Sequence, residues 1–265
     1  MSLNALPQAV SIPAGEFDMG APGEQEDQRP VHRVYLDAYE IAAHPVTVGQ
    51  YGRFVQETGY RVPAIYEIPM IVAGGGRDRE QAFRGIADPY AWAEEGPPRE
   101  RLDHPVTLVR WEDATAYCGW LSSLTGRLVR LPTEAEWERA ARGPDGAGPY
   151  PWGSELEPAR ANYLCQPARR DGAGTTPVTR FAPNGFGLHD LIGNVWEWVG
   201  DWYANDYYAM SPGQNPRGPQ RGAMRVVRGG GWPTSDPAML TCSYRHTVPP
   251  DTYSYSIGFR FVISR

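Results

Sequence analysis

The sequence contains no lysine, only three cysteines and no run of about 18 apolar residues. The cysteines, at positions 118, 165 and 242, are too widely spaced to predict a disulfide framework or a zinc site. With no long apolar run and no charged start followed by one, we expect neither a membrane span nor a signal peptide, and a cytoplasmic location. The formal net charge of −6 and the lack of a basic run exclude nucleic acid and anionic membrane as expected partners.

Glycine, proline and aromatic residues are abundant. The 265 residues include 30 Gly and 26 Pro, which predict a loop-rich chain, whereas nine Trp and 12% aromatic residues argue against disorder. No linker or internal repeat divides the sequence. We therefore expect a single α+β domain over residues 1–265, with few short helices.

Capping signals mark the expected helices. Thr47 can cap a helix that ends at Gly59, and residues 111–124 carry an apolar stripe of helical spacing. Thr133, with a glutamate three residues later, is a capping-box pattern that opens a third helix. Residues 62–104 show no such pattern, and we expect them to form a long irregular excursion.

The stretch at 225–262 is the most unusual part of the sequence. Both of its ends read as strands, and a Gly229–Gly231 turn follows the first of them. Its middle interleaves Tyr, Ser and Thr with residues that look fixed, such as Arg245. Tyrosine gives contact area at low entropic cost, and small hydroxyls give adaptable hydrogen bonds, so this composition is typical of a binding surface.

A series of motifs resembles a known family. They are IPAGEFDMG at 12–20, HPVTLVRWEDATAYCGWL at 104–121, LVRLPTEAEWERAARG from 128, PNGFGLHDLIGNVWEWVGDWY at 183–203, RVVRGGGW at 225–232 and IGFRFV at 257–262. In this order they are similar to the formylglycine-generating-enzyme, or sulfatase-modifying-factor, domain. The resemblance covers nearly the whole chain and implies a C-type-lectin-like fold of the α+β class, whereas function has to be argued from the site.

The resemblance does not extend to the family's redox metals. Its oxidase branch holds copper with two cysteines, and the matching positions here are Asp236 and Thr241. Cys242 stands one place away without a partner, and the five histidines are scattered, so we expect neither copper nor iron. A metal-dependent oxidase or oxygenase of the formylglycine-generating-enzyme type, with a rearranged site around Cys242, Tyr244 and His246, remains the alternative.

The family also implies calcium. Two loops of related proteins hold Ca²⁺ with side-chain and backbone oxygens, as a hard cation requires. By position, the first loop would use the side chains of Asn162 and Asp171 with the carbonyls of Tyr163 and Ala173. The second would use Asp190 with the carbonyls of Leu191, Gly193 and Val195. The other interpretation is that Asn162 and Asp190 only stabilise turns. The neighbouring residues 196–198 are expected in the core.

A third branch of the family is the variable protein of diversity-generating retroelements, which rewrite adenines in the gene. Asn codons of the form AAY then become Tyr, Ser, Thr, His and other residues, but not Glu, Gln, Lys, Met or Trp. Every position of the stretch outside its apparent framework lies within the reachable set: Pro233, Thr234, Ser235, Ala238, Thr241, Ser243, His246, Thr247, Val248, Thr252, Tyr253, Ser254, Tyr255 and Ser256.

The resemblance to this branch favours a diversified, non-catalytic binding protein. We expect the 14 side chains to face solvent and to bind a selected ligand, with a protein as the expected class, while the strands and Arg245 carry stability. An ordinary polar loop, or an accessory module with an invariant C-terminal stretch, would share this composition. The identity of the ligand, the oligomeric state and display at a surface stay open.

Overall fold

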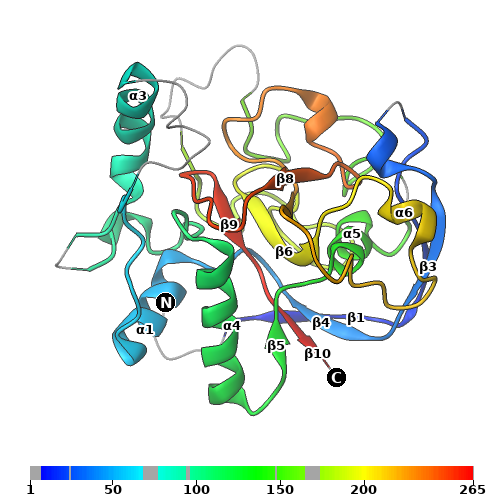
Figure 1. Cartoon of the computed structure of the whole chain (residues 1–265), viewed down its shortest axis with the longest axis horizontal. Coiled ribbons are helices and arrows are strands. Elements are labelled where there is room, and N and C mark those ends of the chain that lie inside the picture. The colour runs from blue at the N-terminus through cyan, green and yellow to red at the C-terminus, as the bar shows by residue number, and fades with distance from the viewer. Residues whose placement is uncertain are drawn as a thin grey trace.

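The computed structural model describes residues 7–23, 25–67, 77–93, 96–146, 148–164 and 174–264. It has the mixed α+β architecture that the sequence predicted, with short helices and several small sheets. The helices α1 (Val48–Thr58) and α3 (Arg77–Ala87) stand at one end of the molecule, and a two-stranded ribbon lies at the other (Figure 1). No helix within these described ranges has the length and the apolar character that a membrane crossing requires.

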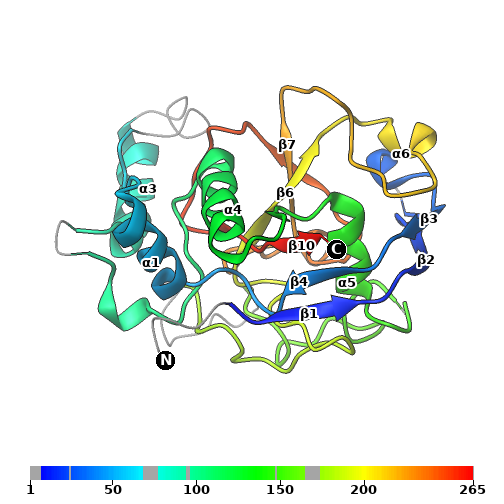
Figure 2. The same cartoon turned by 90° about the horizontal axis from the view of Figure 1, so that it is seen from below.

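The strands form two four-stranded sheets and one ribbon. The first sheet runs β1 (Ala9–Ile12), β4 (Tyr39–Ala42), β10 (Val262–Ser264) and β5 (Val129–Arg130), all antiparallel (Figure 2). The second runs β8 (His246–Val248), β7 (Arg225–Arg228), β6 (Trp196–Trp202) and β9 (Ile257–Phe259), of which β6 and β9 are parallel. The ribbon pairs β2 (Gly15–Met19) with β3 (His32–Leu36).

The helices begin and end where the capping signals predicted. In α1 (Val48–Thr58) and α5 (Glu134–Arg142), the side chain of the threonine before the helix accepts a bond from the amide of the third helical residue. The side-chain oxygen of that residue accepts one from the threonine amide. Gly59 and Gly126 close α1 and α4 (Trp111–Thr125) in the left-handed conformation that favours glycine. The remaining helices are α3 (Arg77–Ala87), α6 (Tyr207–Met210) and the 3₁₀ turns Glu26–Gln28, Asp88–Tyr90, Arg99–Arg101 and Pro237–Met239.

The excursion at 62–104 is more regular than predicted. It contains α3 and two of the 3₁₀ turns. Only Phe83 and Ala87 of α3 are buried, and the rest of the helix is exposed or half-buried. The apolar spacing is therefore too sparse to stand out in the sequence, and the two buried side chains fix the position of the helix.

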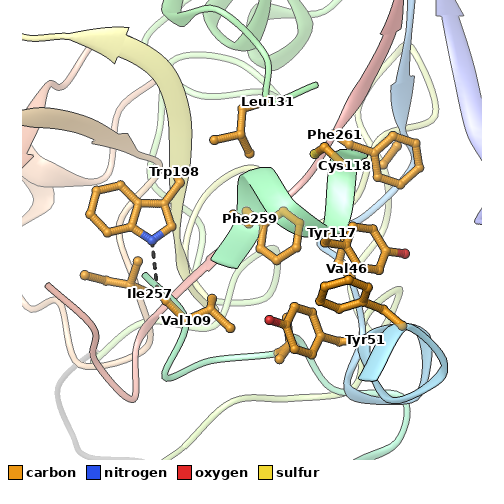
Figure 3. Close-up of a cluster of buried hydrophobic side chains, with 14 of the residues drawn as sticks. Val46, Tyr51, Val109, Tyr117, Cys118, Leu131, Trp198, Ile257, Phe259 and Phe261 are labelled. Atoms are coloured by element: carbon orange, nitrogen blue, oxygen red, sulfur yellow. Dashed lines mark hydrogen bonds between the residues drawn. The ribbon is translucent and has the colours of Figure 1, made fainter. Parts of the chain in front are cut away.

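Two large apolar clusters form the core. The first lies between α1, α4 and the sheets, where Tyr51 and Tyr117 stack 5.8 Å apart and Phe259 meets both rings (Figure 3). Trp198 fills the far side and donates its Nε1 hydrogen to the carbonyl of Val109 at 3.1 Å. The second cluster surrounds Trp137 on α5, on the other side of β6 and β7. These clusters hold both ends of the stretch 225–262 in place.

Candidate functional site

Three enclosed arginines fasten the C-terminal stretch to the rest of the fold. Arg228 donates to Glu134 and Glu138 on α5, each at 2.7 Å, and Arg245 holds both oxygens of Glu134. Arg260 does the same with Glu197 on β6 at 2.6 and 2.7 Å. Buried guanidinium groups need such carboxylate partners, because an unpaired charge in the interior is strongly unfavourable. The predicted anchoring role of Arg245 therefore has a clear physical basis.

The glycine turn after β7 requires glycine because neighbouring residues lie close to its backbone. Gly229 and Gly230 have positive φ angles of 92° and 77°. A Cβ at Gly230 would lie 2.5 Å from Leu240, so a side chain cannot be accommodated there. Thr234 closes the turn by accepting a hydrogen bond from the Gly231 amide at 3.1 Å. The turn belongs to the framework, and so does Thr234.

The prediction that all 14 candidate ligand-binding side chains face solvent is wrong. Six of them are buried: Thr234, Ser243, Val248, Thr252, Tyr253 and Ser256. The reasons are local for Thr234, which caps the glycine turn, and for Val248, which packs into the first core cluster. Ser256 directly precedes β9, beside β6, and its carbonyl accepts the Trp196 amide at 2.8 Å.

Tyr253 is buried by a part of the chain far away in sequence. Its ring packs with Phe83 of α3 at 6.5 Å in a third apolar cluster, and Arg110 lies over the ring at 5.4 Å. Its hydroxyl donates to the carbonyl of Glu67. The excursion 62–104 thus folds back over this end of the stretch and excludes solvent from a side chain that the composition had assigned to display.

Eight candidate positions remain accessible. Ser235 and Ala238 are exposed, and the others are half-buried: Pro233, Thr241, His246, Thr247, Ser254 and Tyr255. They lie around a set of aromatic side chains that we call the aromatic face, made of Trp196, Trp232, Tyr244, His246 and Tyr255. Within it, the rings of Trp196 and His246 are 5.0 Å apart, those of Trp196 and Tyr244 are 6.0 Å apart, and those of Trp232 and Tyr255 are 5.6 Å apart.

The framework members of the aromatic face come from regular alternation in the sequence. Trp196 and Trp198 are two residues apart on β6, so both point to the first cluster, whereas Glu197 points away to Arg260. All three are buried, as predicted for residues 196–198. Trp196 nevertheless contacts His246, and the pattern WEW gave no sign that one of its two tryptophans adjoins the accessible side chains.

Polar atoms of the aromatic face are free to bind a ligand. Within the described part of the chain, His246 and the hydroxyls of Tyr244 and Tyr255 form no hydrogen bond with the protein, and none of them is among the buried polar atoms without a partner, so they are open to solvent. Burial lowers the pKa of His246 below its ordinary value, so the ring is neutral near pH 7. Rings with accessible polar groups at their edges are the usual lining of binding sites that combine contact area with specificity.

Cys242 is separated from this face. It is fully buried in the second cluster, whereas Tyr244 belongs to the first and His246 contacts Trp196. Burial raises the pKa of the Cys242 thiol to about 12, so the thiolate that would bind a metal is disfavoured. Over the described ranges, no three His, Cys, Asp or Glu side chains gather in a way that could hold a metal ion. Of the rearranged site that the alternative hypothesis placed at these residues, the structure brings together Tyr244 and His246, whose rings stack 6.5 Å apart, but it leaves Cys242 in the other cluster.

The first predicted calcium loop lies partly outside the described residues. Asp171 and Ala173 are not described, and Tyr163 is buried. The Asn162 amide donates to the carbonyl of Gly174 at 2.9 Å. This bond fits the role of a turn-stabilising residue.

The second predicted calcium loop contains the buried carboxylate of Asp190. Asp190 has a positive φ angle of 54°, and its Oδ2 accepts the Thr179 amide at 3.2 Å. Its Oδ1 is buried and has no hydrogen-bond partner among the described residues. Burial raises the pKa of Asp190 to about 7. A buried carboxylate with one oxygen free is the donor chemistry that a hard cation takes.

Comparison with known proteins agrees with this fold. Residues 2–265 match the sulfatase-modifying factor enzyme 1-like domain. The chain is 38% identical over 291 residues to the formylglycine-generating enzyme of Thermomonospora curvata, covering 95% of this chain and 91% of that protein. It is 34% identical over 281 residues to the inactive Cα-formylglycine-generating enzyme 2 of Bos taurus, covering 95% and 86% of the two chains.

One further relative is a longer protein, and two solved structures resemble this chain. The chain is 37% identical to the serine/threonine-protein kinase pkn1 of Chlamydia pneumoniae, but it spans only 38% of the length of that protein. PvdO from Pseudomonas aeruginosa superimposes with a TM-score of 0.78 at 27% identity, over 98% of this chain and 95% of that one. Treponema denticola variable protein 1 superimposes with a TM-score of 0.72 at 23% identity, over 97% of this chain and 95% of that one. It therefore shares the fold.

Proposed function

The chain belongs to the family of sulfatase-modifying factor enzyme 1-like domains, and from that premise we propose that it is a diversified binding protein without catalytic activity. The observation that carries the proposal is the chemistry of the stretch 225–262. Asp236 and Thr241 stand where the resemblance expects the two copper-binding cysteines, and the one cysteine nearby, Cys242, is enclosed in the core. The stretch therefore has no thiolate pair at these positions, while the strands on both sides of it are present.

The proposed ligand-binding surface is the aromatic face with the eight accessible positions around it. Its stability comes from the buried arginine pairs and the glycine turn, so the accessible side chains are free to change. This separation of framework from contact residues is what a surface that varies under selection requires. A protein is the expected ligand, since the surface is broad and lined by aromatic and small hydroxyl groups.

The family is compatible with loss of catalysis. Relatives of similar identity include one named as a formylglycine-generating enzyme and one named as an inactive one. A structure with the same fold bears the name of a variable protein, although at 23% identity it supports the fold alone. Family membership therefore leaves the activity to be argued from the residues of this chain.

The second candidate is a metal-dependent oxidase or oxygenase of the formylglycine-generating-enzyme type. The 38% identity to a protein with that name, over 91% of its length, is the observation in its favour. Purified protein would then contain copper or iron in stoichiometric amount and consume oxygen with a cysteine-containing peptide. The binding proposal predicts neither copper nor iron and no oxygen consumption, so metal analysis and an oxygen electrode separate the two candidates.

We further propose calcium as a structural ion at the second loop. The free Oδ1 of Asp190 supports it, and the carbonyls of Leu191, Gly193 and Val195 would complete the ligand set. The ion would stabilise the loops that precede β6. It would have no part in ligand contacts, because Asp190 is buried.

A further inference from the structure

Arg225, at the start of β7, is enclosed but has no carboxylate partner. It is 8% exposed, and within the described ranges it forms no ion pair. The other enclosed arginines of the described structure, Arg228, Arg245 and Arg260, are all paired with glutamates. A charge in the interior without a partner is unfavourable, so the unpaired charge of Arg225 calls for an explanation.

Two tryptophans hold the guanidinium of Arg225 in place. Its Cζ lies 3.7 Å from the ring centroid of Trp111, at the start of α4, and 3.4 Å from that of Trp202, at the end of β6. Trp111 is itself fixed, because its Nε1 donates to the carbonyl of Val199 at 2.9 Å. The faces of aromatic rings attract cations, and a guanidinium stacks on them through its own planar faces. We call Arg225 with these two indoles the arginine clamp.

The edge of this guanidinium keeps donors for a ligand. A guanidinium carries several N–H donors, and here Nη1 donates one of them to the carbonyl of Gly200 at 2.7 Å. The Nε atom of Arg225 is buried without a partner. The Nη2 group also forms no hydrogen bond with the described residues, and it is not among the buried polar atoms, so it is open to solvent. A ligand therefore meets the edge of the group, where its N–H donors point.

Asp201 is the acidic residue whose charge acts on Arg225, and it does not neutralise the clamp. Its Oδ2 accepts the Glu134 amide at 2.8 Å, and no ion pair joins it to Arg225 in the described structure. Burial, followed by the charge of Glu134, raises the pKa of Asp201 to about 8, so this carboxyl is mostly protonated near pH 7. Burial also lowers the pKa of Arg225, to about 10, which leaves the guanidinium charged. The clamp therefore carries an unpaired positive charge near pH 7.

The arginine clamp lies on the same side of the second sheet as the aromatic face. Arg225 is two residues from Val227 along β7, and residues two apart in a strand point to the same side, roughly 7 Å from each other. Val227 pairs directly with His246 of the aromatic face, and such pairs also share a side of the sheet. A ligand that covers the aromatic face can thus extend to Arg225.

From this geometry we infer that the arginine clamp binds a carboxylate, the side chain of an aspartate or glutamate on a partner protein. A carboxylate matches a guanidinium in shape, and the two form charge-assisted hydrogen bonds. The clamp supplies a single positive charge, which a single carboxylate balances, whereas a phosphate monoester carries more negative charge than that near pH 7. The inference rests on the proposed binding function for the kind of partner, a protein, and it names an acidic group of that partner.

The test uses an acetylated and amidated peptide with one aspartate between aromatic residues, and a matched peptide with asparagine in its place. Binding to the full chain is followed by NMR through the indole N–H signals of Trp111 and Trp202 and the Nε–H signal of Arg225. The aspartate peptide should shift these signals in a saturable way. Its affinity should exceed that of the asparagine peptide by about fivefold or more, the upper end of the range for a partly exposed ion pair. Equal affinities, or no saturable shift with either peptide, would overturn the inference.

Substitutions locate the site. Arg225→Gln removes the charge and should abolish the preference for the aspartate peptide, whereas Arg225→Lys keeps the charge and should retain part of that preference. Arg221→Gln is the matched control, an exposed arginine just before β7, and should leave both affinities unchanged. Equal effects of Arg225→Gln and Arg221→Gln would show only a general effect of net charge and would contradict the assignment. If Arg225→Gln does not fold, Arg225→Lys and the two peptides on the unaltered protein still decide the question.

Competition with small anions separates a carboxylate from other ligands. Inorganic phosphate should displace the aspartate peptide no better than acetate does at the same ionic strength, and a clear advantage of phosphate would make the carboxylate inference wrong. If protein ligands selected for binding at the aromatic face bind Arg225→Gln as tightly as the unaltered protein, the inference fails while the binding function stands. Stoichiometric copper with oxygen consumption would instead contradict the binding function itself.

Discussion

Arg245 donates two hydrogen bonds to the two carboxylate oxygens of Glu134, from Nε at 2.8 Å and from Nη2 at 3.0 Å, and the arginine side chain is fully enclosed. This pair joins the C-terminal stretch to α5 across 111 positions of sequence. Glu134 also accepts a bond from Arg228 at 2.7 Å. One carboxylate therefore holds both ends of the segment that carries the glycine turn.

Substituting Glu134 should destabilise the fold more than substituting Arg245. Glu134→Gln leaves two buried guanidinium groups short of charge, and we expect a loss of roughly 3–5 kcal/mol in the free energy of unfolding. Arg245→Met leaves Glu134 still paired with Arg228, so its loss should be smaller. Urea unfolding measures both. Arg33→Gln is the control, because the Arg33–Asp18 pair at 3.3 Å is largely exposed and should contribute less than about 1 kcal/mol.

Substitutions at Tyr253 and Ser235 should change the free energy of unfolding by different amounts, although the sequence placed both among the candidate ligand-binding residues. Tyr253→Ala removes a buried ring from the cluster around Phe83, and we expect it to lower the free energy of unfolding by about 3 kcal/mol. Ser235→Ala changes an exposed side chain, and its effect should stay within about 0.5 kcal/mol. If Tyr253→Ala were equally neutral, α3 would not cover this end of the stretch.

Asp190 should make stability depend on pH and on calcium. Its pKa of about 7 in the folded state is above its value in the unfolded chain, so the folded state holds a proton that the unfolded state releases. Without calcium, stability should therefore rise as pH falls from about 7 toward the unfolded value. Above pH 7, calcium at a hundred times its dissociation constant should add about 2.7 kcal/mol. Thermal unfolding with calcium and with chelator measures both effects.

The matched variant for this prediction is Asp190→Asn. Asp201, whose pKa burial also raises to about 8, adds pH dependence of the same sign and is unchanged in the variant. The difference between the two proteins therefore isolates Asp190. A calcium response that persists in Asp190→Asn would assign the ion to another loop.

The two described cysteines should resist modification in the native protein. Cys118 and Cys242 are buried, and burial raises the pKa of both thiols, that of Cys242 to about 12. Iodoacetamide at pH 8 should leave both unmodified until the protein is unfolded, as peptide mass spectrometry can follow. Rapid native alkylation of Cys242 would mean that its thiolate is accessible, and the oxidase alternative would gain support.

Local signals predicted α1, α4, α5 and the glycine turn, because these features depend on neighbouring residues. Thr47 and Thr133 carry their capping boxes within four residues of sequence, and the Gly229–Gly231 turn follows directly from a strand. The burial of Tyr253 depends on Phe83, which is 170 positions earlier by the difference of their numbers, and nothing near Tyr253 announces that contact. Composition alone thus grouped the 14 candidate side chains but could not separate the buried ones from the accessible ones.

The most direct test of diversification is to sequence the codons for residues 225–262 in many copies of this gene from one population of its source organism. We predict that Arg228, Thr234, Arg245 and Tyr253 are unchanged and that adenine-reachable codons vary at the accessible positions Pro233, Ser235, Ala238, Thr241, His246, Thr247, Ser254 and Tyr255. A stretch that is identical in every copy would contradict diversification. Variation that reached the buried arginines as often as the accessible positions would contradict the division between framework and binding surface.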